Sequence, residues 1–156
     1  MALKPGDKAP DFTLYSSEKK AISLDDYKGK NLVILFFPAA FTGVCTKELC
    51  GVRDSLGSYN SLNTDVVAIS VDMVYSLAKY KEEQAYNFPL LSDFNKEIST
   101  AYFSIYDSWN FNMTGVSKRS AFVVDKDGVI QYAEVLENVL EIPNFEAINE
   151  VLNKLN

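Results

Sequence analysis

The chain alternates between short apolar runs and longer segments in which apolar residues recur at helical spacing. The clearest run, 32–37 (LVILFF), is stopped by Pro38. A continuous apolar run of this length is typical of a strand that is buried on both faces of a sheet between parallel neighbours. We therefore expect 32–37 to form the central strand.

Helical spacing is found in three longer segments. The first begins after Thr42, a good N-cap residue, and is expected to end at Gly57 or at later polar residues. The other two, 74–86 and 144–155, are also amphipathic. Between the first two lies 65–71 (DVVAISV), which predicts a second buried strand. The resulting order is strand, helix, strand, helix.

Turn residues predict two hairpins near the ends of the chain. Residues 11–15 (DFTLY) alternate polar and apolar side chains, as in the edge strand of an N-terminal hairpin. Residues 121–124 and 129–133 flank the turn sequence DKDG, which predicts a second hairpin. The segment 95–118 is weakly patterned, and only a short helix near 96–102 is expected there.

Together these elements predict an α/β fold with a central mixed sheet flanked by helices. The thioredoxin-like fold, with an N-terminal β-hairpin extension, fits this order best. The chain has 156 residues, of which 47% are hydrophobic, and this is enough for one well-buried core. We therefore expect a single domain over residues 1–156.

Charge and composition exclude several functions. The formal net charge of -6 opposes binding to nucleic acid or to anionic membrane surfaces. The first residues lack the apolar core of a signal peptide, and no run approaches the roughly 20 apolar residues of a membrane span, so we expect a cytoplasmic protein. The chain has no histidine, which excludes Ser-His-Asp and Cys-His catalysis and every histidine-containing metal site. We expect neither a metal nor another cofactor.

The two cysteines are Cys45 and Cys50, and two thiols alone cannot close a four-ligand zinc site. In a reducing cytosol such a pair favours redox chemistry over structural stapling. Cys45 falls in the first turn of the helix expected after Thr42, where free N–H groups and the helix dipole favour a reactive thiolate. The other interpretation is a structural thiol, because free cysteine is among the most buried residue types.

The residues around Cys45 favour the reactive interpretation. Pro38, Thr42 and Cys45 form the pattern Pro-x3-Thr-x2-Cys, which resembles the active-site signature of the peroxiredoxins. Glu48 follows three residues after the cysteine, and Arg119 opens the sequence RSAFVVD, which is similar to the arginine-bearing strand of that family. The resemblance is specific in residue type and spacing, and it covers almost the whole chain.

The resemblance implies a role for each of these residues. The Cys45 thiolate attacks a peroxide, while Arg119 supplies positive charge and N–H donors to sulfur and peroxide. The Thr42 hydroxyl and the Cys45 N–H hold the two oxygens in line. Pro38 shields the thiolate from water, and Glu48 orients Arg119. Taken singly, Arg119 could be an exposed strand residue, Thr42 only a cap and Pro38 only a strand terminator; their joint occurrence argues for function.

Cys50 determines the subtype. Its spacing from Cys45 resembles the peroxiredoxin Q, or bacterioferritin comigratory protein, group, in which a resolving cysteine lies five residues after the peroxidatic one. The sequence Phe-Thr-Gly-Val-Cys is instead similar to alkyl hydroperoxide reductase E, in which an intrachain resolving cysteine need not be present. Two mechanisms therefore stay open: Cys50 resolves the sulfenic acid, or an external thiol does so and Cys50 is a buried helical thiol. Arg53 is a weaker candidate for a supporting residue.

The resemblance also implies a hydroperoxide substrate and a thioredoxin-like or glutaredoxin-like reductant, in a monomer or a homodimer. Phe37, Phe41 and Trp109 are candidates for an apolar collar around the peroxide or for a subunit interface, although core packing explains most aromatic residues. Two other classes of function are alternatives. A thiol-disulfide oxidoreductase usually carries Cys-x-x-Cys, and a binding or holdase module does not need the full constellation.

Overall fold

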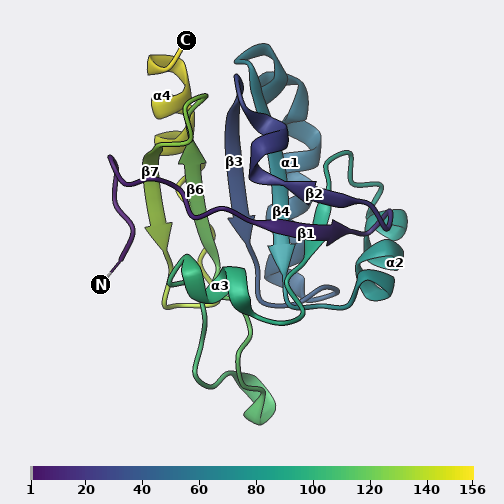
Figure 1. Ribbon diagram of the computed structural model, residues 1–156. Coiled ribbons are helices and arrows are strands. Elements are labelled where there is room, and N and C mark those ends of the chain that lie inside the picture. Colours follow the sequence, from purple (N-terminus) through teal and green to yellow (C-terminus); the bar gives the residue numbers. More distant parts are fainter. Residues whose placement is uncertain (1) are drawn as a thin grey trace.

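The computed structural model describes residues 2–156, whose strands form one mixed seven-stranded sheet (Figure 1). The strands follow the order β2-β1-β5-β4-β3-β6-β7 across the sheet. Their bounds are β1 Thr13–Ser16, β2 Ala21–Ser23, β3 Asn31–Phe36, β4 Thr64–Ser70, β5 Leu90–Ser92, β6 Ser120–Val124 and β7 Ile130–Val135.

Strands β3, β4 and β5 run parallel, whereas β6 is antiparallel to β3 and β1 is antiparallel to β5. The expectation for 32–37 was therefore right about burial and wrong about position. Every residue of β3 is buried, but only one of its neighbours is parallel, and the middle place in the sheet belongs to β4. A strand that pairs with the antiparallel C-terminal hairpin is as fully buried as one between two parallel strands, so its apolar run does not distinguish the two.

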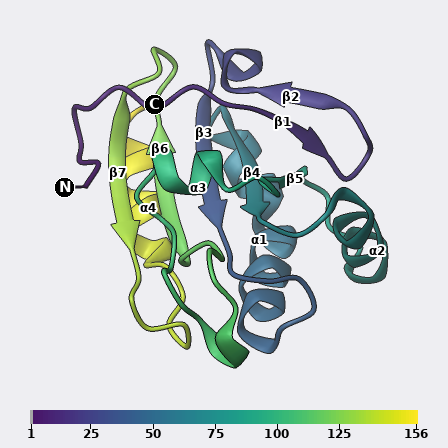
Figure 2. The same cartoon turned by 60° about the horizontal axis from the view of Figure 1, so that its bottom comes forward.

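Helices cover both faces of the sheet (Figure 2). Side chains of α1, α2 and α4 share one apolar cluster with one face, while α3 and the N-terminal segment pack on the other. Successive side chains of β3 alternate between the two clusters, as in any strand covered on both faces. The helices span α1 Gly43–Ser61, α2 Val74–Gln84, α3 Glu97–Ala101 and α4 Phe145–Lys154, with short 3-10 helices at Leu24–Tyr27 and Asn110–Asn112.

Most of the expected elements are confirmed with shifted ends. Helix α2 stops two residues before the predicted end, because Ala85 adopts a left-handed conformation with φ 53°. Helix α1 continues beyond Gly57 to Ser61. Both hairpins form, and the DKDG turn has its glycine, Gly128, at φ 83°. The short strand β5 was not predicted, because its three residues carry no readable period.

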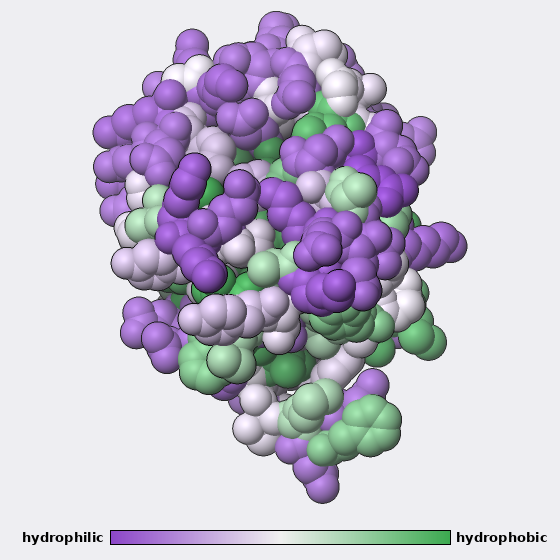
Figure 3. Space-filling model, turned by 90° about the vertical axis from the view of Figure 1, so that its right-hand side faces the viewer, coloured by the Kyte–Doolittle hydropathy of each residue, from purple (hydrophilic) through white to green (hydrophobic). Residues whose placement is uncertain are grey.

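The weakly patterned segment 95–118 contains α3 and then a long excursion that projects below the sheet in Figure 1. Isolated bridges at Ile105–Ser117 and Trp109–Met113 pair its two arms, and Phe111 at its tip is 93% exposed. Figure 3 shows that polar residues cover most of one side of the molecule, whereas apolar ones gather towards its lower end. Among residues 2–156, no helix is both long and apolar enough to cross a membrane.

Candidate active site

The candidate site lies where β3 ends and α1 begins. Strands β3 and β4 are parallel, so the loop after β3 and the turn after β4 meet at the same edge of the sheet. Pro38 is buried two residues after the end of β3, and the loop then reaches α1 through Phe41, which has the unusual φ of 67°. This short, constrained loop brings the start of α1 against the end of the sheet.

Thr42 occupies the N-cap position of α1, as predicted, but its side chain does not cap the helix. Its hydroxyl donates instead to the carbonyl oxygen of Ala39, at 2.8 Å. The N–H groups of the first helical turn are therefore not engaged by the cap side chain, and they contribute the positive end of the helix dipole near Cys45.

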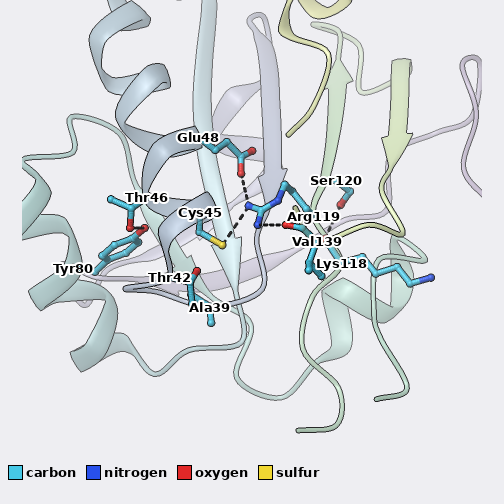
Figure 4. Close-up of polar contacts among 10 residues, drawn as sticks. All are labelled: Ala39, Thr42, Cys45, Thr46, Glu48, Tyr80, Lys118, Arg119, Ser120 and Val139. Atoms are coloured by element: carbon cyan, nitrogen blue, oxygen red, sulfur yellow. Dashed lines mark hydrogen bonds and ion pairs between the residues drawn. The ribbon is translucent and has the colours of Figure 1, made fainter. Parts of the chain in front are cut away.

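Three of the predicted residues meet at one point beside this helix terminus (Figure 4). Arg119, just before β6, donates from Nη1 to the Sγ of Cys45 at 3.2 Å and to Oε1 of Glu48 at 2.8 Å. Its Nη2 donates to the carbonyl oxygen of Val139 at 3.1 Å. Cys45, Glu48 and Arg119 are each at most 2% exposed. The guanidinium is thus held on several sides, with its charge directed at the sulfur.

Burial controls the charges of this cluster. Desolvation raises the pKa of Glu48 to about 7, although the charge of Arg119 and its hydrogen bond oppose the shift. Burial alone lowers the pKa of Arg119, but Cys45 and Glu48 outweigh it, so that the pKa is raised overall and the guanidinium stays protonated. Two buried atoms of this cluster, Oε2 of Glu48 and Nε of Arg119, have no hydrogen-bond partner among the described residues.

Cys50 is not brought to this cluster. It lies on the same continuous helix as Cys45, but its Sγ approaches Oε1 of Gln84 at 3.5 Å and the hydroxyl of Tyr86 at 3.9 Å, at the end of α2. Arg53, the weaker candidate, also contacts this region: Nη1 donates to the carbonyl oxygen of Gln84 at 2.5 Å. Both side chains therefore connect α1 with α2, and Arg53 does not reach Cys45.

The three aromatic candidates have different surroundings. Phe37 is completely buried in the core, and Phe41 is 52% exposed beside Thr42, with its ring 5.0 Å from that of Tyr80. Trp109 belongs to the projecting 103–118 excursion, paired with Met113. Phe37 directly precedes Pro38 and Phe41 directly precedes Thr42, whereas Trp109 lies in a distant segment of the chain.

Sequence reasoning missed two contacts that hold the site. The carboxylate of Asp72 accepts from the N–H of Ala40 at 2.8 Å, and the Val139 carbonyl accepts from Arg119. A signal existed for Asp72, since it follows the strand parallel to β3 and so falls at the same edge of the sheet. The Val139 contact is made by a backbone carbonyl, which every residue type has, so the sequence does not predict it.

Solved structures with the same architecture include peroxidoxin BcpB from Mycobacterium tuberculosis and a PrxQ mutant from Xylella fastidiosa. The BcpB structure has a TM-score of 0.87 and 26% sequence identity, and the match covers 99% of each chain. The PrxQ structure has a TM-score of 0.84 and 26% identity, covering 99% of this chain and 96% of the other. The chain therefore has the thioredoxin-like fold of the peroxiredoxins, as expected.

Similarity in sequence to known proteins covers most of the chain. A Mycobacterium tuberculosis protein with a provisional peroxiredoxin name is 43% identical over 134 residues, 85% of each chain. Alkyl hydroperoxide reductase E of Mycobacterium bovis is 37% identical over 136 residues, 85% of this chain and 86% of that protein. These relatives and the fold define the class as thiol-dependent peroxidases, a group of oxidoreductases. The AhpC/TSA family model matches residues 5–133, and the chain belongs to the AhpC/TSA family.

Proposed function

We propose that Cys45 is the peroxidatic residue and that it reduces hydrogen peroxide and organic hydroperoxides. Its thiolate attacks one peroxide oxygen, a bond forms between sulfur and that oxygen, and the O–O bond breaks. The departing oxygen leaves with the electron pair and takes up a proton, as water or an alcohol. Cys45 is thereby oxidised to a sulfenic acid while the peroxide is reduced.

The single observation that carries this proposal is the position of Arg119. Its Nη1 donates to the sulfur at 3.2 Å, and both groups are at most 2% exposed, so little water screens the interaction. A fixed cation stabilises a thiolate in the ground state and negative charge that moves onto the peroxide in the transition state. Glu48, which accepts from the same Nη1, is the proposed positioning residue for Arg119.

Thr42 and Pro38 complete the proposed site. The Thr42 hydroxyl lies one helical turn before Cys45, where it can contact a peroxide aligned with the helix terminus. Pro38 is buried at the start of the loop and would exclude water from it.

We further propose that Cys50 resolves the sulfenic acid. The Cys50 thiolate attacks the sulfur of Cys45, an S–S bond forms, and the S–O bond breaks with release of hydroxide that becomes water. A thioredoxin-like or glutaredoxin-like dithiol then reduces the disulfide, and it is itself oxidised.

Resolution requires a conformational change. On a continuous helix, five residues advance by about 7.5 Å, which exceeds the limit of about 7 Å between the Cα atoms of a disulfide. Unwinding the start of α1 also has to break its contacts with α2, among them Thr46 Oγ1 with the Tyr80 hydroxyl at 2.9 Å. The second candidate mechanism, in which an external thiol attacks the sulfenic acid, would leave Cys50 in place against Gln84.

Loss of peroxide in the presence of excess dithiothreitol tests the proposed function. The wild type and Cys50→Ser should both consume hydrogen peroxide, because dithiothreitol can replace the resolving thiol, whereas Cys45→Ser should not. Turnover that persists in Cys45→Ser would refute the assignment. Reduction of insulin disulfides without peroxide loss would indicate a thiol-disulfide oxidoreductase instead, and a holdase would keep its activity in Cys45→Ser.

A further inference from the structure

One carboxylate outside the Cys45 cluster holds the loop that leads into it. Asp72 lies in the turn between β4 and α2, and a single oxygen, Oδ2, accepts from the Ala40 N–H at 2.8 Å and from the Ser70 hydroxyl at 2.6 Å. Ala40 belongs to the loop after β3, so this contact crosses from one parallel strand to the next. Hydrogen bonds to an ionised carboxylate are stronger than those between neutral groups.

The Ala40 N–H and the Ala39 carbonyl belong to one peptide unit, which is planar and rigid. The other end of that unit, the Ala39 oxygen, accepts from the Thr42 hydroxyl at 2.8 Å (Figure 4). Asp72 and Thr42 are therefore joined through one peptide plane, with Asp72 at its N–H and Thr42 at its C=O. Hydrogen bonds in such a chain polarise one another, so the carboxylate also makes the Ala39 oxygen a better acceptor.

The direction of the last hydrogen bond determines what Thr42 can offer. A carbonyl oxygen only accepts, so the single hydroxyl proton of Thr42 is directed at Ala39. Only the lone pairs of the hydroxyl remain, and these accept hydrogen bonds. A Thr42 held in this way receives the O–H of a peroxide and cannot donate to it.

The loop between β3 and α1 has an unusual backbone conformation. It lies outside the regular elements, and Phe41, between the two bonded parts, adopts φ 67°, a conformation that costs energy for any residue with a Cβ. Such a conformation persists only where the surrounding contacts fix it. Phe41 lies between the donors of the two hydrogen bonds described above. The Ala40 N–H, which donates to Asp72, precedes it, and the Thr42 hydroxyl, which donates to Ala39, follows it.

We infer that Asp72 is a positioning residue for peroxide reduction, which acts through the Ala39–Ala40 peptide to fix the Thr42 hydroxyl as an acceptor for the peroxide O–H. The inference rests on the proposed function of Cys45. Within residues 2–156, the hydrogen bonds of the Asp72 carboxylate go to Ala40 and Ser70 and not to Cys45 or Arg119. We therefore expect Asp72 to affect the alignment of the substrate and not the ionisation of the sulfur. These two effects can be measured separately.

The first test compares two reactions of Cys45 in Asp72→Ala. The second-order rate constant for oxidation by hydrogen peroxide should fall by about 10-fold or more, since small errors in alignment are costly. Alkylation by iodoacetamide, which needs the thiolate but no alignment of a peroxide, should stay within about twofold of the wild type. The matched control is Ser92→Ala, which removes the hydrogen bond from Ser92 Oγ to the Asp72 carbonyl oxygen and leaves the carboxylate in place. It should leave both rates unchanged.

The second test asks whether Asp72 acts through Thr42. In a Thr42→Val background there is no hydroxyl to orient, so adding Asp72→Ala should change the peroxide rate by less than about twofold. In Thr42→Ser, which keeps a hydroxyl, the full effect of Asp72→Ala should return. Asp72→Asn retains the shape of the side chain without its charge. It should lower the peroxide rate by a smaller factor than Asp72→Ala does, and this effect should also disappear in Thr42→Val.

Additive effects of Asp72→Ala and Thr42→Val would overturn the inference, as would equal losses in peroxide reaction and alkylation. So would peroxide rates within about twofold of the wild type in both Asp72 variants, since a lost alignment should cost more than that. These failures differ from failure of the proposed function, in which the wild-type Cys45 itself does not react with peroxide.

Discussion

Arg119 donates from one nitrogen, Nη1, to both the Sγ of Cys45 and Oε1 of Glu48, at 3.2 and 2.8 Å. One guanidinium therefore contacts both a cysteine sulfur and a carboxylate, and these two groups are three residues apart on α1. A change at any one of these three residues therefore alters the electrostatic field at the other two.

Replacing Arg119 by Met should lower kcat/KM for hydrogen peroxide by about 100-fold, because the fixed positive charge and its donors are lost. The matched control is Lys118→Met. Lys118 pairs with the exposed Glu137 at the surface, so its loss should leave the rate unchanged.

Arg119→Met also leaves Glu48 as a buried carboxyl without a partner, which should destabilise the fold by about 3–5 kcal/mol. The double variant Arg119→Met/Glu48→Gln removes both buried groups and should recover part of that stability, while the peroxide rate stays low. A double variant that recovers the rate together with the stability would show that Arg119 has only a structural role.

Glu48 should make the stability depend on pH. Burial raises its pKa from the ordinary 4.5 to about 7, so the folded state binds this proton more tightly than the unfolded state does. Its contribution to the free energy of unfolding is therefore complete below about pH 4.5 and is lost as the pH rises to about 7. The size of this loss is on the order of 1–3 kcal/mol.

Denaturant unfolding of the wild type and Glu48→Gln between about pH 5 and pH 8 checks this dependence. Other titrating groups are shared by the two proteins, so the difference between the curves reports Glu48. The wild type should lose stability relative to the variant as the pH rises. Parallel curves would mean that the Glu48 carboxyl does not titrate in this range.

Oxidation should loosen the start of α1. If Cys45 and Cys50 form a disulfide, amide hydrogen exchange should increase across residues 43–53, because the intact helix cannot hold that bond. Cys50→Ser should still reduce the first peroxide, stop at the sulfenic acid and show no such increase. A disulfide that forms only between chains would contradict the intrachain mechanism.

The contact between Thr46 and Tyr80 provides a related test of the unwinding step. Thr46→Val keeps the shape of the side chain and removes its 2.9 Å hydrogen bond to α2. Disulfide formation after peroxide addition should become several-fold faster, while the rate of the first oxidation of Cys45 stays the same. An unchanged rate of disulfide formation would show that this bond does not resist unwinding.

The fold was largely predictable because its main elements have strong periodic patterns. The buried run of β3, the amphipathic helices and the DKDG turn each identify an element locally. The order of strands across the sheet depends on pairings between distant segments, so the apolar run of β3 did not reveal its antiparallel neighbour β6. Strand β5 is only three residues long and has no local signal.

The candidate site was predictable in its residue types and not in its geometry. The spacing around Cys45 identified Pro38 and Thr42, and the sequence RSAFVVD identified Arg119, which lies 3.2 Å from Cys45 Sγ in the structure. The orientation of the Thr42 hydroxyl towards a loop carbonyl, in place of the helix N–H groups, depends on a loop conformation that no local pattern encodes.

Intact mass after one equivalent of hydrogen peroxide tests the central claim most directly. The wild type should lose both thiols and about 2 Da, as one intramolecular disulfide requires, and Cys45→Ser should stay unmodified. A gain of about 16 Da with Cys50 still free would leave Cys45 as the peroxidatic residue and assign resolution to an external thiol. A wild type that keeps both thiols free and unmodified while peroxide remains would contradict the account.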